Sequence, residues 1–261
     1  IGIVGLGGAV FPTAVKTNTQ NKPVNTLILN ASECEPYITC DDMLMRTDPE
    51  KIVTGAKILQ HIVGAKKILI GIEENKPQAI EALNHAINNT DIEIIVVPNK
   101  YPSGGEKQLI HLLTGIEVPS QGLPLDVGIL CQNVGTCVAV AEAVLEGKPF
   151  IDRIVTLTGD ALAKPQNVRA LIGTSIHELI EHHSGFAKAC QRTLMGGPMM
   201  GFSLPDIDRP IAKGSNCVLS LHEVEPTQEP QPCIRCGECV KVCPALLLPQ
   251  QLYVNIFTKY I

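Results

Sequence analysis

Four short apolar stretches, each bounded by polar or turn residues, recur along the first half of the chain. Their Val, Ile and Leu content predicts buried β-strands, and the longer segments between and after them carry apolar residues at helical spacing. The predicted strands are 24–30, 66–72, 92–98 and 126–131, and the predicted helices are 48–67, 76–89, 103–115 and 134–147. Asp48 and Pro49 are expected to form the cap and first turn of the first helix. This alternation predicts an α/β fold with a Rossmann-like parallel sheet, covered by helices on both faces.

The pattern changes beyond residue 150. Residues 153–175 predict two strands joined in a hairpin, residues 176–185 a short helix that ends at a glycine, and residues 217–221 a further strand. These elements suit a small α+β module at 151–222. An acidic, proline-rich stretch at 223–232 has little to bury and predicts a linker.

Composition limits the possible partners. Apolar residues make up 45 % of the 261, so we expect a packed globular interior, with residues 1–150 as the α/β domain. Aromatic residues make up 3 %, Trp is absent and the net charge is −5, which together disfavour nucleic acid as a partner. No apolar run approaches the ~18 residues of a membrane span, and no signal peptide is recognisable. Because the chain opens on IGIVGLGG without Met, we interpret it as an internal fragment.

The stretch CIRCGECVKVCP, at 233–244, holds four cysteines. Its spacing, C-x2-C-x2-C-x3-C-P, is the bacterial ferredoxin pattern for a 4Fe–4S cluster, and it predicts that 233–261 is the start of a truncated ferredoxin-type domain. The predicted metal ligands are Cys233, Cys236, Cys239 and Cys243. Gly237 can adopt the positive φ that a tight loop around one cluster requires, and Ile234, Val240 and Val242 could shield the sulfurs from water. Zinc is the alternative metal, but structural zinc sites prefer two separated ligand pairs.

The fourth cysteine leaves two possibilities. In two-cluster ferredoxins it ligates the other cluster, so Cys243 either completes this cluster or reaches a second one whose cysteine run is not in this sequence. PALLLPQQLY suits a helix that leads toward such a partner, and we favour the second possibility. The other cysteines lie mostly in apolar stretches and are expected to be small core residues in a reducing, intracellular protein. They are Cys34, Cys40, Cys131, Cys137, Cys190 and Cys217.

A glycine-rich turn, GLGGAVFPTAVK, lies at Gly5–Lys16. It fails the G-x-G-x-x-G test for dinucleotide loops because Val10 stands at the third glycine. What remains is a glycine turn followed by a helix start, which is a ready site for a phosphate group, and Lys16 could add a positive charge.

Three further polar loops follow predicted strands. They are NASECEP (Asn30–Pro36), YPSGGEKQ (Tyr101–Gln108) and CQNVGT (Cys131–Thr136). Because ligands of parallel sheets collect at the carboxyl ends of strands, we expect all four loops to face one crevice. An ordinary acidic surface loop is the alternative interpretation of NASECEP.

The four loops together resemble those of the FMN- and NADH-binding subunit of respiratory complex I and its relatives. That family carries G-R-G-G-A-G-F-P-T-G-x-K, N-A-D-E-x-E-P, Y-x-x-G-E-E and N-N-V-x-T loops around its flavin. The resemblance implies that the cofactor-binding residues are Gly5, Gly7, Gly8, Lys16, Asn30, Glu33, Glu35, Tyr101, Glu106, Asn133 and Thr136. It also implies that Glu35 and Glu106 lie near the hydride path as the catalytic residues. The chain departs from the pattern at four positions, Leu6, Val10, Ser32 and Gln132.

The whole order of parts resembles the C subunit of the Rnf complex: flavin-type loops, a β-grasp module of SLBB type, then ferredoxin-type cysteines. GLGGAVFPTAVK, LNASECEPYITCDD, MGGPMMG and CPALLLPQQLY carry this resemblance. It implies a peripheral subunit on the cytoplasmic side of the inner membrane, bound to the other subunits of an Rnf-type complex that moves Na⁺ or H⁺. The subunit would pass electrons between NADH, FMN and 4Fe–4S clusters, since a flavin joins two-electron to one-electron chemistry.

A rival hypothesis is a non-catalytic wiring and docking subunit that keeps the clusters and has lost the flavin pocket. The four departures from the family pattern are what it would predict. MGGPMMG, at Met195–Gly201, also stays open between a contact with a ligand or partner and a tight connection packed by methionines.

Overall fold

The structure, a computed structural model, describes residues 2–20, 22–224, 231–243 and 247–258. The chain separates into two compact units, the first ending at Val224 and the second starting at Glu225. Most of the predicted linker, and the end of the cysteine run at Pro244, fall outside the described residues.

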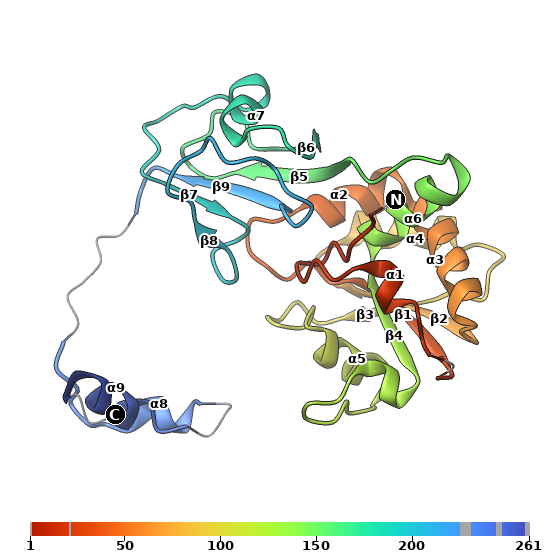
Figure 1. Cartoon of the computed structure of the whole chain (residues 1–261), viewed down its shortest axis with the longest axis horizontal. Helices are drawn as coiled ribbons and strands as arrows, with labels where there is room; N and C mark the ends of the chain where they lie inside the picture. Colours follow the sequence, from red (N-terminus) through yellow and green to blue (C-terminus); the bar gives the residue numbers. More distant parts are fainter. Residues whose placement is uncertain (1, 21, 225–230, 244–246, 259–261) are drawn as a thin grey trace. The chain divides into compact units, whose positions relative to one another are not determined.

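A four-stranded parallel sheet organises the first unit (Figure 1) and confirms the predicted fold class. Its strands are β1 (Thr26–Ala31), β2 (Lys67–Glu73), β3 (Glu93–Val97) and β4 (Ile129–Asn133), in the order β3-β2-β1-β4. The chain runs from β1 outward to β2 and β3, and then returns to the other side of β1 as β4. The strand order therefore reverses between β1 and β4, which is where open α/β sheets bind their ligands.

Helices cover both faces of this sheet, as predicted. They are α2 (Cys40–Thr47), α3 (Pro49–Val63), α4 (Pro77–Ala86), α5 (Glu106–Thr114), the 3-10 helix η1 (Pro124–Val127) and α6 (Val134–Leu145). Alternate residues of β1 divide between the faces, since Leu27 and Leu29 join the core formed with α3, α4 and α6, while Ile28 joins the core formed with α5. A Cβ at Gly55 of α3 would lie 1.9 Å from the carbonyl oxygen of Cys137 in α6, so only glycine allows this close packing.

The apolar pattern does not predict α2, which is eight residues long. Helix α3 begins directly after it, with Pro49 in its first turn as expected. Asp48 occupies the N-cap position of α3 as expected, but its side chain accepts no hydrogen bond from the start of that helix. A carboxylate oxygen of Asp48 instead accepts a hydrogen bond from the Thr47 hydroxyl at 2.9 Å.

A second, five-stranded sheet forms the α+β module predicted after residue 150. Its strands are β5 (Asp152–Thr158), β6 (Gln166–Leu171), β7 (Arg192–Met195), β8 (Phe202–Ser203) and β9 (Cys217–Leu221), in the order β6-β5-β9-β7-β8. The predicted hairpin is the antiparallel pair β5–β6, and β9 pairs in parallel with β5. Helix α7 (Ile176–His183) packs its apolar residues on this sheet and is followed by Gly185 at a φ of 64°, as the sequence predicts.

The second unit contains α8 (Glu238–Lys241) and α9 (Pro249–Thr258). Gly237 has a φ of 78°, which confirms its predicted place at the turn of the cysteine run. None of the helices in the described ranges combines the length and apolar composition that a membrane crossing requires.

Candidate functional site

The four predicted loops come together at the carboxyl edge of the parallel sheet. We call them the glycine loop (Gly5–Lys16), the carboxylate loop (Asn30–Pro36), the tyrosine loop (Tyr101–Gln108) and the asparagine loop (Cys131–Thr136). Hydrogen bonds join them although they lie far apart in the sequence. The contacts are Leu6 N–H to Thr136 Oγ1 (3.0 Å), Lys16 Nζ to Glu106 Oε1 (2.6 Å) and Asn30 Nδ2 to the Gly104 carbonyl (2.8 Å). The loops therefore form one continuous rim over β1 and β4.

The first part of the glycine loop is a tight turn. The Gly5 N–H donates to the Phe11 carbonyl at 2.8 Å and closes this turn, and α1 (Thr13–Lys16) forms the rest of the loop. Gly8 has a φ of 107° and open space beside it, whereas Gly7 packs against the Asn133 side chain. Val10 has a φ of 53°, a left-handed conformation that β-branched residues rarely adopt. The backbone thus keeps the glycine-type shape of the family loop at Val10.

Replacing Val10 by Gly is expected to stabilise the protein by about 1 kcal/mol. A left-handed conformation costs a residue with a Cβ roughly 1–2 kcal/mol, and the greater chain entropy of glycine cancels part of that gain. Thermal unfolding would show the effect as a higher Tm for V10G. Val15→Gly, inside α1, is the matched control and should lower the Tm. A Tm for V10G at or below the wild-type value would contradict the inference that the backbone is strained at Val10.

Lys16 and Glu106 form an ion pair at the mouth of the glycine and tyrosine loops. Their side chains remain 29 % and 39 % exposed, so the pair is accessible to solvent. The lysine predicted to meet a phosphate and the acid predicted to lie near the hydride path are therefore neighbours. Tyr101, in the same tyrosine loop, is also exposed.

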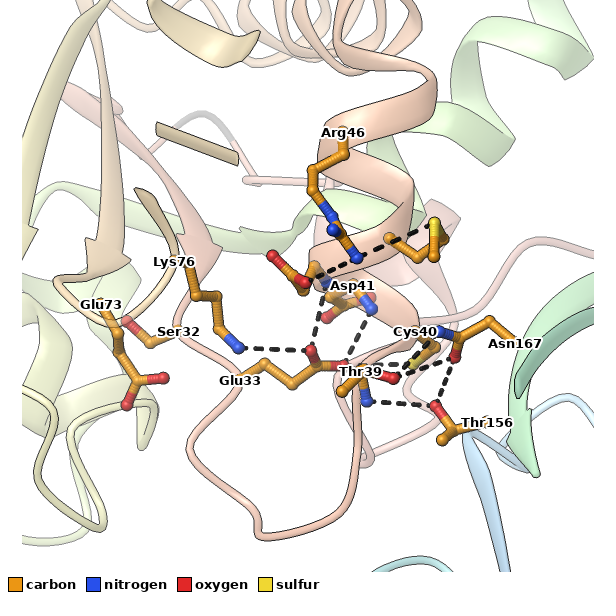
Figure 2. A network of polar contacts seen from close by, with 12 residues as sticks. Ser32, Glu33, Thr39, Cys40, Asp41, Arg46, Glu73, Lys76, Thr156 and Asn167 are labelled. Carbon is orange, nitrogen blue, oxygen red and sulfur yellow. Dashed lines mark hydrogen bonds and ion pairs between the residues drawn. The ribbon is translucent and has the colours of Figure 1, made fainter. Parts of the chain in front are cut away.

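Glu33 lies in a buried network rather than on the open rim (Figure 2). Its carboxylate accepts hydrogen bonds from the N–H groups of Asp41 (2.8 Å) and Asp42 (3.1 Å), which satisfies the start of α2. Lys76 Nζ lies 3.6 Å from the second oxygen. Burial raises the pKa of Glu33 to about 7, and the nearby carboxylate of Asp41 acts in the same direction.

Further buried groups surround this carboxylate. The Cys40 thiol donates to Glu33 Oε1 at 3.4 Å, and Asn133 Nδ2 donates to Asp41 Oδ2 at 2.6 Å while its oxygen caps α6. Burial raises the pKa of the Asp41 carboxyl and lowers that of the Arg153 guanidinium, which interacts with Cys40 and Asp41. Ligand-type atoms of Glu33, Cys40 and Asp41 lie within 4.8 Å of one another, as in a metal site. Because the Glu33 carboxylate is already bound by two N–H groups of α2 and lies beside Lys76, we interpret the group as structural.

Three buried polar atoms near the rim have no hydrogen-bond partner among the described residues. They are Gln132 Nε2 at the end of β4, Thr13 Oγ1 at the start of α1 and Glu73 Oε2 at the end of β2. Glu73 uses its other oxygen to accept a hydrogen bond from the Ser103 hydroxyl at 3.0 Å. Unpaired buried polar groups are costly, so their grouping at one edge of the sheet fits a polar ligand bound there.

Glu35 is the predicted site residue whose position was least expected. Its carboxylate oxygen Oε1 accepts hydrogen bonds from the N–H groups of Met199 (2.7 Å) and Met200 (2.9 Å). MGGPMMG therefore contacts the candidate site within the same chain, while a contact of this segment with a ligand or partner stays a prediction. The glycine-rich sequence of this segment was the only indication of a special role. The contact itself could not be predicted, because the two segments lie 164 residues apart in the sequence.

The cysteine run has four free thiols, three exposed and one half-buried. Cys243 Sγ accepts a hydrogen bond from the Leu247 N–H at 3.4 Å. Two of the three residues expected to shield the sulfurs are exposed, Ile234 at 85 % and Val242 at 76 %, whereas Val240 is half-buried. Of the six other cysteines, four are buried as predicted, Cys34 is half-buried and Cys190 is exposed.

Comparison with protein families identifies the class. The family model described as "Nuo51 FMN-binding domain" matches residues 1–142, and the SLBB domain model matches residues 154–203. The chain therefore belongs to the family of the Nuo51 FMN-binding domain, followed by an SLBB domain.

Curated relatives are more specific. The C subunit of the ion-translocating oxidoreductase complex of Pseudomonas aeruginosa is 53 % identical over 256 residues, which is 97 % of this chain and 33 % of that protein. The protein of the same name from Erwinia tasmaniensis is 51 % identical over 255 residues, 97 % of this chain and 32 % of that protein. The chain thus spans about a third of the length of these relatives. They confirm the resemblance to the C subunit of the Rnf complex.

Solved structures agree on the fold. A chain in the crystal structure of NAD+-reducing [NiFe]-hydrogenase in the air-oxidized state matches with a TM-score of 0.69 and 24 % identity. The match covers 84 % of this chain and 44 % of that one, and the H2-reduced state gives a TM-score of 0.71. At this identity the match supports the shared fold of the first unit.

Proposed function

We propose that this chain binds FMN and NADH in its first unit and 4Fe–4S clusters through its cysteine run. It would pass electrons between NADH and the clusters as part of a membrane-associated, ion-translocating oxidoreductase. The observation that carries the proposal is the joining of four family loops at the switch point of the parallel sheet. FMN would supply the exchange between two-electron and one-electron transfer.

The residues present fit a flavin phosphate and ring. The glycine loop has open space beside Gly8, where the backbone can approach a phosphate group, and Lys16 at the end of α1 supplies a positive charge from the same loop. Gln132 Nε2 and Thr13 Oγ1 are buried polar atoms without partners among the described residues, and both can donate to an acceptor on the ligand. In this proposal Gly5, Gly7, Asn30, Asn133 and Thr136 keep the loops in register through the contacts described above.

Glu106 is the acid best placed to orient a nicotinamide, because it is half-exposed on the rim and fixed by Lys16. Tyr101 lies exposed in the same loop. Glu33 acts from below the rim by capping α2 and holding Lys76. No side chain needs to act as a general acid or base in this assignment.

Partners and location rest on the relatives, which are named as subunits of an ion-translocating oxidoreductase complex. We therefore propose the other subunits of an Rnf-type complex as partners and a peripheral position on the cytoplasmic side of the inner membrane.

The test combines flavin binding with NADH oxidation. We expect FMN fluorescence to be quenched on titration with the protein, and the reconstituted protein to reduce ferricyanide with NADH. Glu106→Gln should lower this rate on the order of tenfold to a hundredfold because the nicotinamide loses its orientation. Glu81→Gln, an exposed acid on α4, should leave the rate unchanged. If the protein quenches no FMN fluorescence and oxidises no NADH, the rival wiring and docking function is favoured.

A further inference from the structure

The SLBB-type domain reaches the rim of the candidate site. Its β7–β8 connection, residues 196–201, is here called the methionine loop. Glu35 of the carboxylate loop binds this segment through two adjacent backbone N–H groups, those of Met199 and Met200, at 2.7 and 2.9 Å. Hydrogen bonds to a charged carboxylate are among the stronger ones in proteins, so this contact fixes one loop against the other.

The fit between the methionine loop and Glu35 is close. A Cβ at Gly197 would lie 2.2 Å from Glu35 Cγ and 2.5 Å from its Oε1. A Cβ at Gly201 would lie 2.3 Å from the Gly197 carbonyl oxygen, which accepts the Gly201 N–H at 2.9 Å. Both glycines are therefore needed for the loop to close around the carboxylate.

The segment between β8 and β9, in the same α+β module but beyond the residues that the SLBB model matches, also contacts the N-terminal part of the chain. Lys213 Nζ donates to the Gly2 carbonyl at 2.6 Å, close to the glycine loop. A Cβ at Gly214 would lie 2.7 Å from Val10 Cγ2 within that loop. The α+β module thus meets both the carboxylate loop and the glycine loop, and its placement beside the rim rests on two independent contacts.

Apolar side chains remain exposed where the methionine loop meets the carboxylate loop. Met200 is 77 % exposed, Met199 53 % and Tyr37 55 %, and Tyr37 follows Pro36 directly. Thioether and aromatic side chains favour contact with planar rings. Exposed side chains of this kind beside a nucleotide crevice suit the ring of a bound dinucleotide.

We propose that the methionine loop is a fifth wall of the nucleotide site, contributed by the SLBB-type domain and held in place by Glu35. Its ligand is the nicotinamide dinucleotide, so the inference rests on the proposed function of the same site. Glu35 is then a positioning residue that acts through the loop and does not itself touch the nicotinamide.

A double-mutant cycle in the complete protein tests this assignment. Glu35→Ala removes the acceptor, and Gly197→Ala displaces the loop while it leaves the carboxylate intact. Each change should speed hydrogen exchange at the Met199 and Met200 amides about tenfold or more without any ligand, since both lose their hydrogen bonds. Each should also raise the KM for NADH roughly tenfold with bound FMN unchanged, and the double variant should be no worse than either single variant.

Two further variants distinguish the role of the methionine side chains from that of the Glu35 hydrogen bonds. Glu35→Gln keeps a carbonyl acceptor, so it should restore much of the amide protection and of the KM. Replacing Met199 and Met200 together by Ala should raise the KM yet leave the amides protected.

Several outcomes would overturn the assignment. They are unprotected amides in the wild type, additive effects of Glu35→Ala and Gly197→Ala, or an unchanged KM in all variants of a protein that binds FMN and oxidises NADH. Failure of the wild type to bind FMN would instead reject the proposed function, while amide exchange would still report whether Glu35 holds the loop.

Discussion

Replacing Cys236 by Ser in the complete protein should remove about four iron atoms per chain and most of the associated visible absorbance. The reason is that a 4Fe–4S cluster needs each of its thiolate ligands, and a serine hydroxyl is a poor substitute. Cys236 is exposed in the described structure, so the substitution leaves no cavity in a core. Iron analysis, labile sulfide and the absorption spectrum of the purified variant provide the measurement.

Cys190 offers the matched control, because it is also an exposed free thiol but lies outside the cysteine run. Cys190→Ser should keep the full iron content. Zinc in place of iron, or an iron content that Cys236→Ser leaves unchanged, would reject the cluster assignment.

The role of Cys243 can be decided in the same experiment. If it serves a second cluster, Cys236→Ser and Cys243→Ser together should remove about eight iron atoms, and if both ligate one cluster they should remove about four. We expect the larger loss, since the fourth cysteine of this spacing ligates the other cluster in two-cluster ferredoxins.

The layout of the fold followed from local patterns. The strands of the parallel sheet are short and rich in branched apolar residues, and α3, α4 and α6 carry apolar residues at helical spacing. Each of these elements can therefore be predicted from its own residues. The topology of a parallel sheet then places the four loops at one edge, so their meeting could be predicted from the order of the strands and helices. Helix α2 was missed because its first turn depends on Glu33, a residue outside the helix and its apolar pattern.

The burial and the hydrogen-bond partners of the individual site residues could not be predicted in the same way. Glu33 and Glu35 stand two positions apart in one acidic loop, yet one is buried beneath the rim and the other holds a distant domain. Nothing in NASECEP distinguishes them, because the difference lies in their partners: Lys76 for Glu33, and Met199 with Met200 for Glu35. Contacts across such separations depend on the assembled fold.

The effect of the departures from the family pattern can also be judged only from the contacts that these residues make in the structure. Leu6 is buried, and its N–H is bound to Thr136. Ser32 is held by Asn30 and by the Gly71 carbonyl, while Gln132 keeps an unpaired donor among the described residues. These substitutions preserve the outline of the rim, and the outline is what the FMN proposal requires.

Replacing Glu33 by Ala should lower the free energy of unfolding by about 3–5 kcal/mol at pH 8, the largest stability effect that we expect in the chain. The variant leaves Lys76, whose side chain is 8 % exposed, without its carboxylate and removes the acceptor for two N–H groups of α2. Urea unfolding provides the measurement. Glu50→Ala, an exposed acid on α3, should change the stability by less than about 0.5 kcal/mol.

The pH dependence has a definite sign. The pKa of Glu33 in the folded protein is raised from 4.5 to about 7, so between these values the folded state binds more protons than the unfolded state. Stability therefore falls as the pH rises through this interval, by about 3 kcal/mol in total. The Asp41 carboxyl, whose pKa burial also raises, adds to the same trend.

Glu33→Gln separates the charge from the hydrogen bonds. The amide oxygen of Gln can still accept the N–H groups of Asp41 and Asp42, but the side chain no longer titrates. Urea unfolding of E33Q between pH 5 and pH 8 should show a flatter profile than that of the wild type, whereas Glu50→Gln should keep the wild-type slope. A wild-type stability that rises over this interval would mean that Lys76 and the α2 N–H groups outweigh burial, and that Glu33 stays ionised throughout.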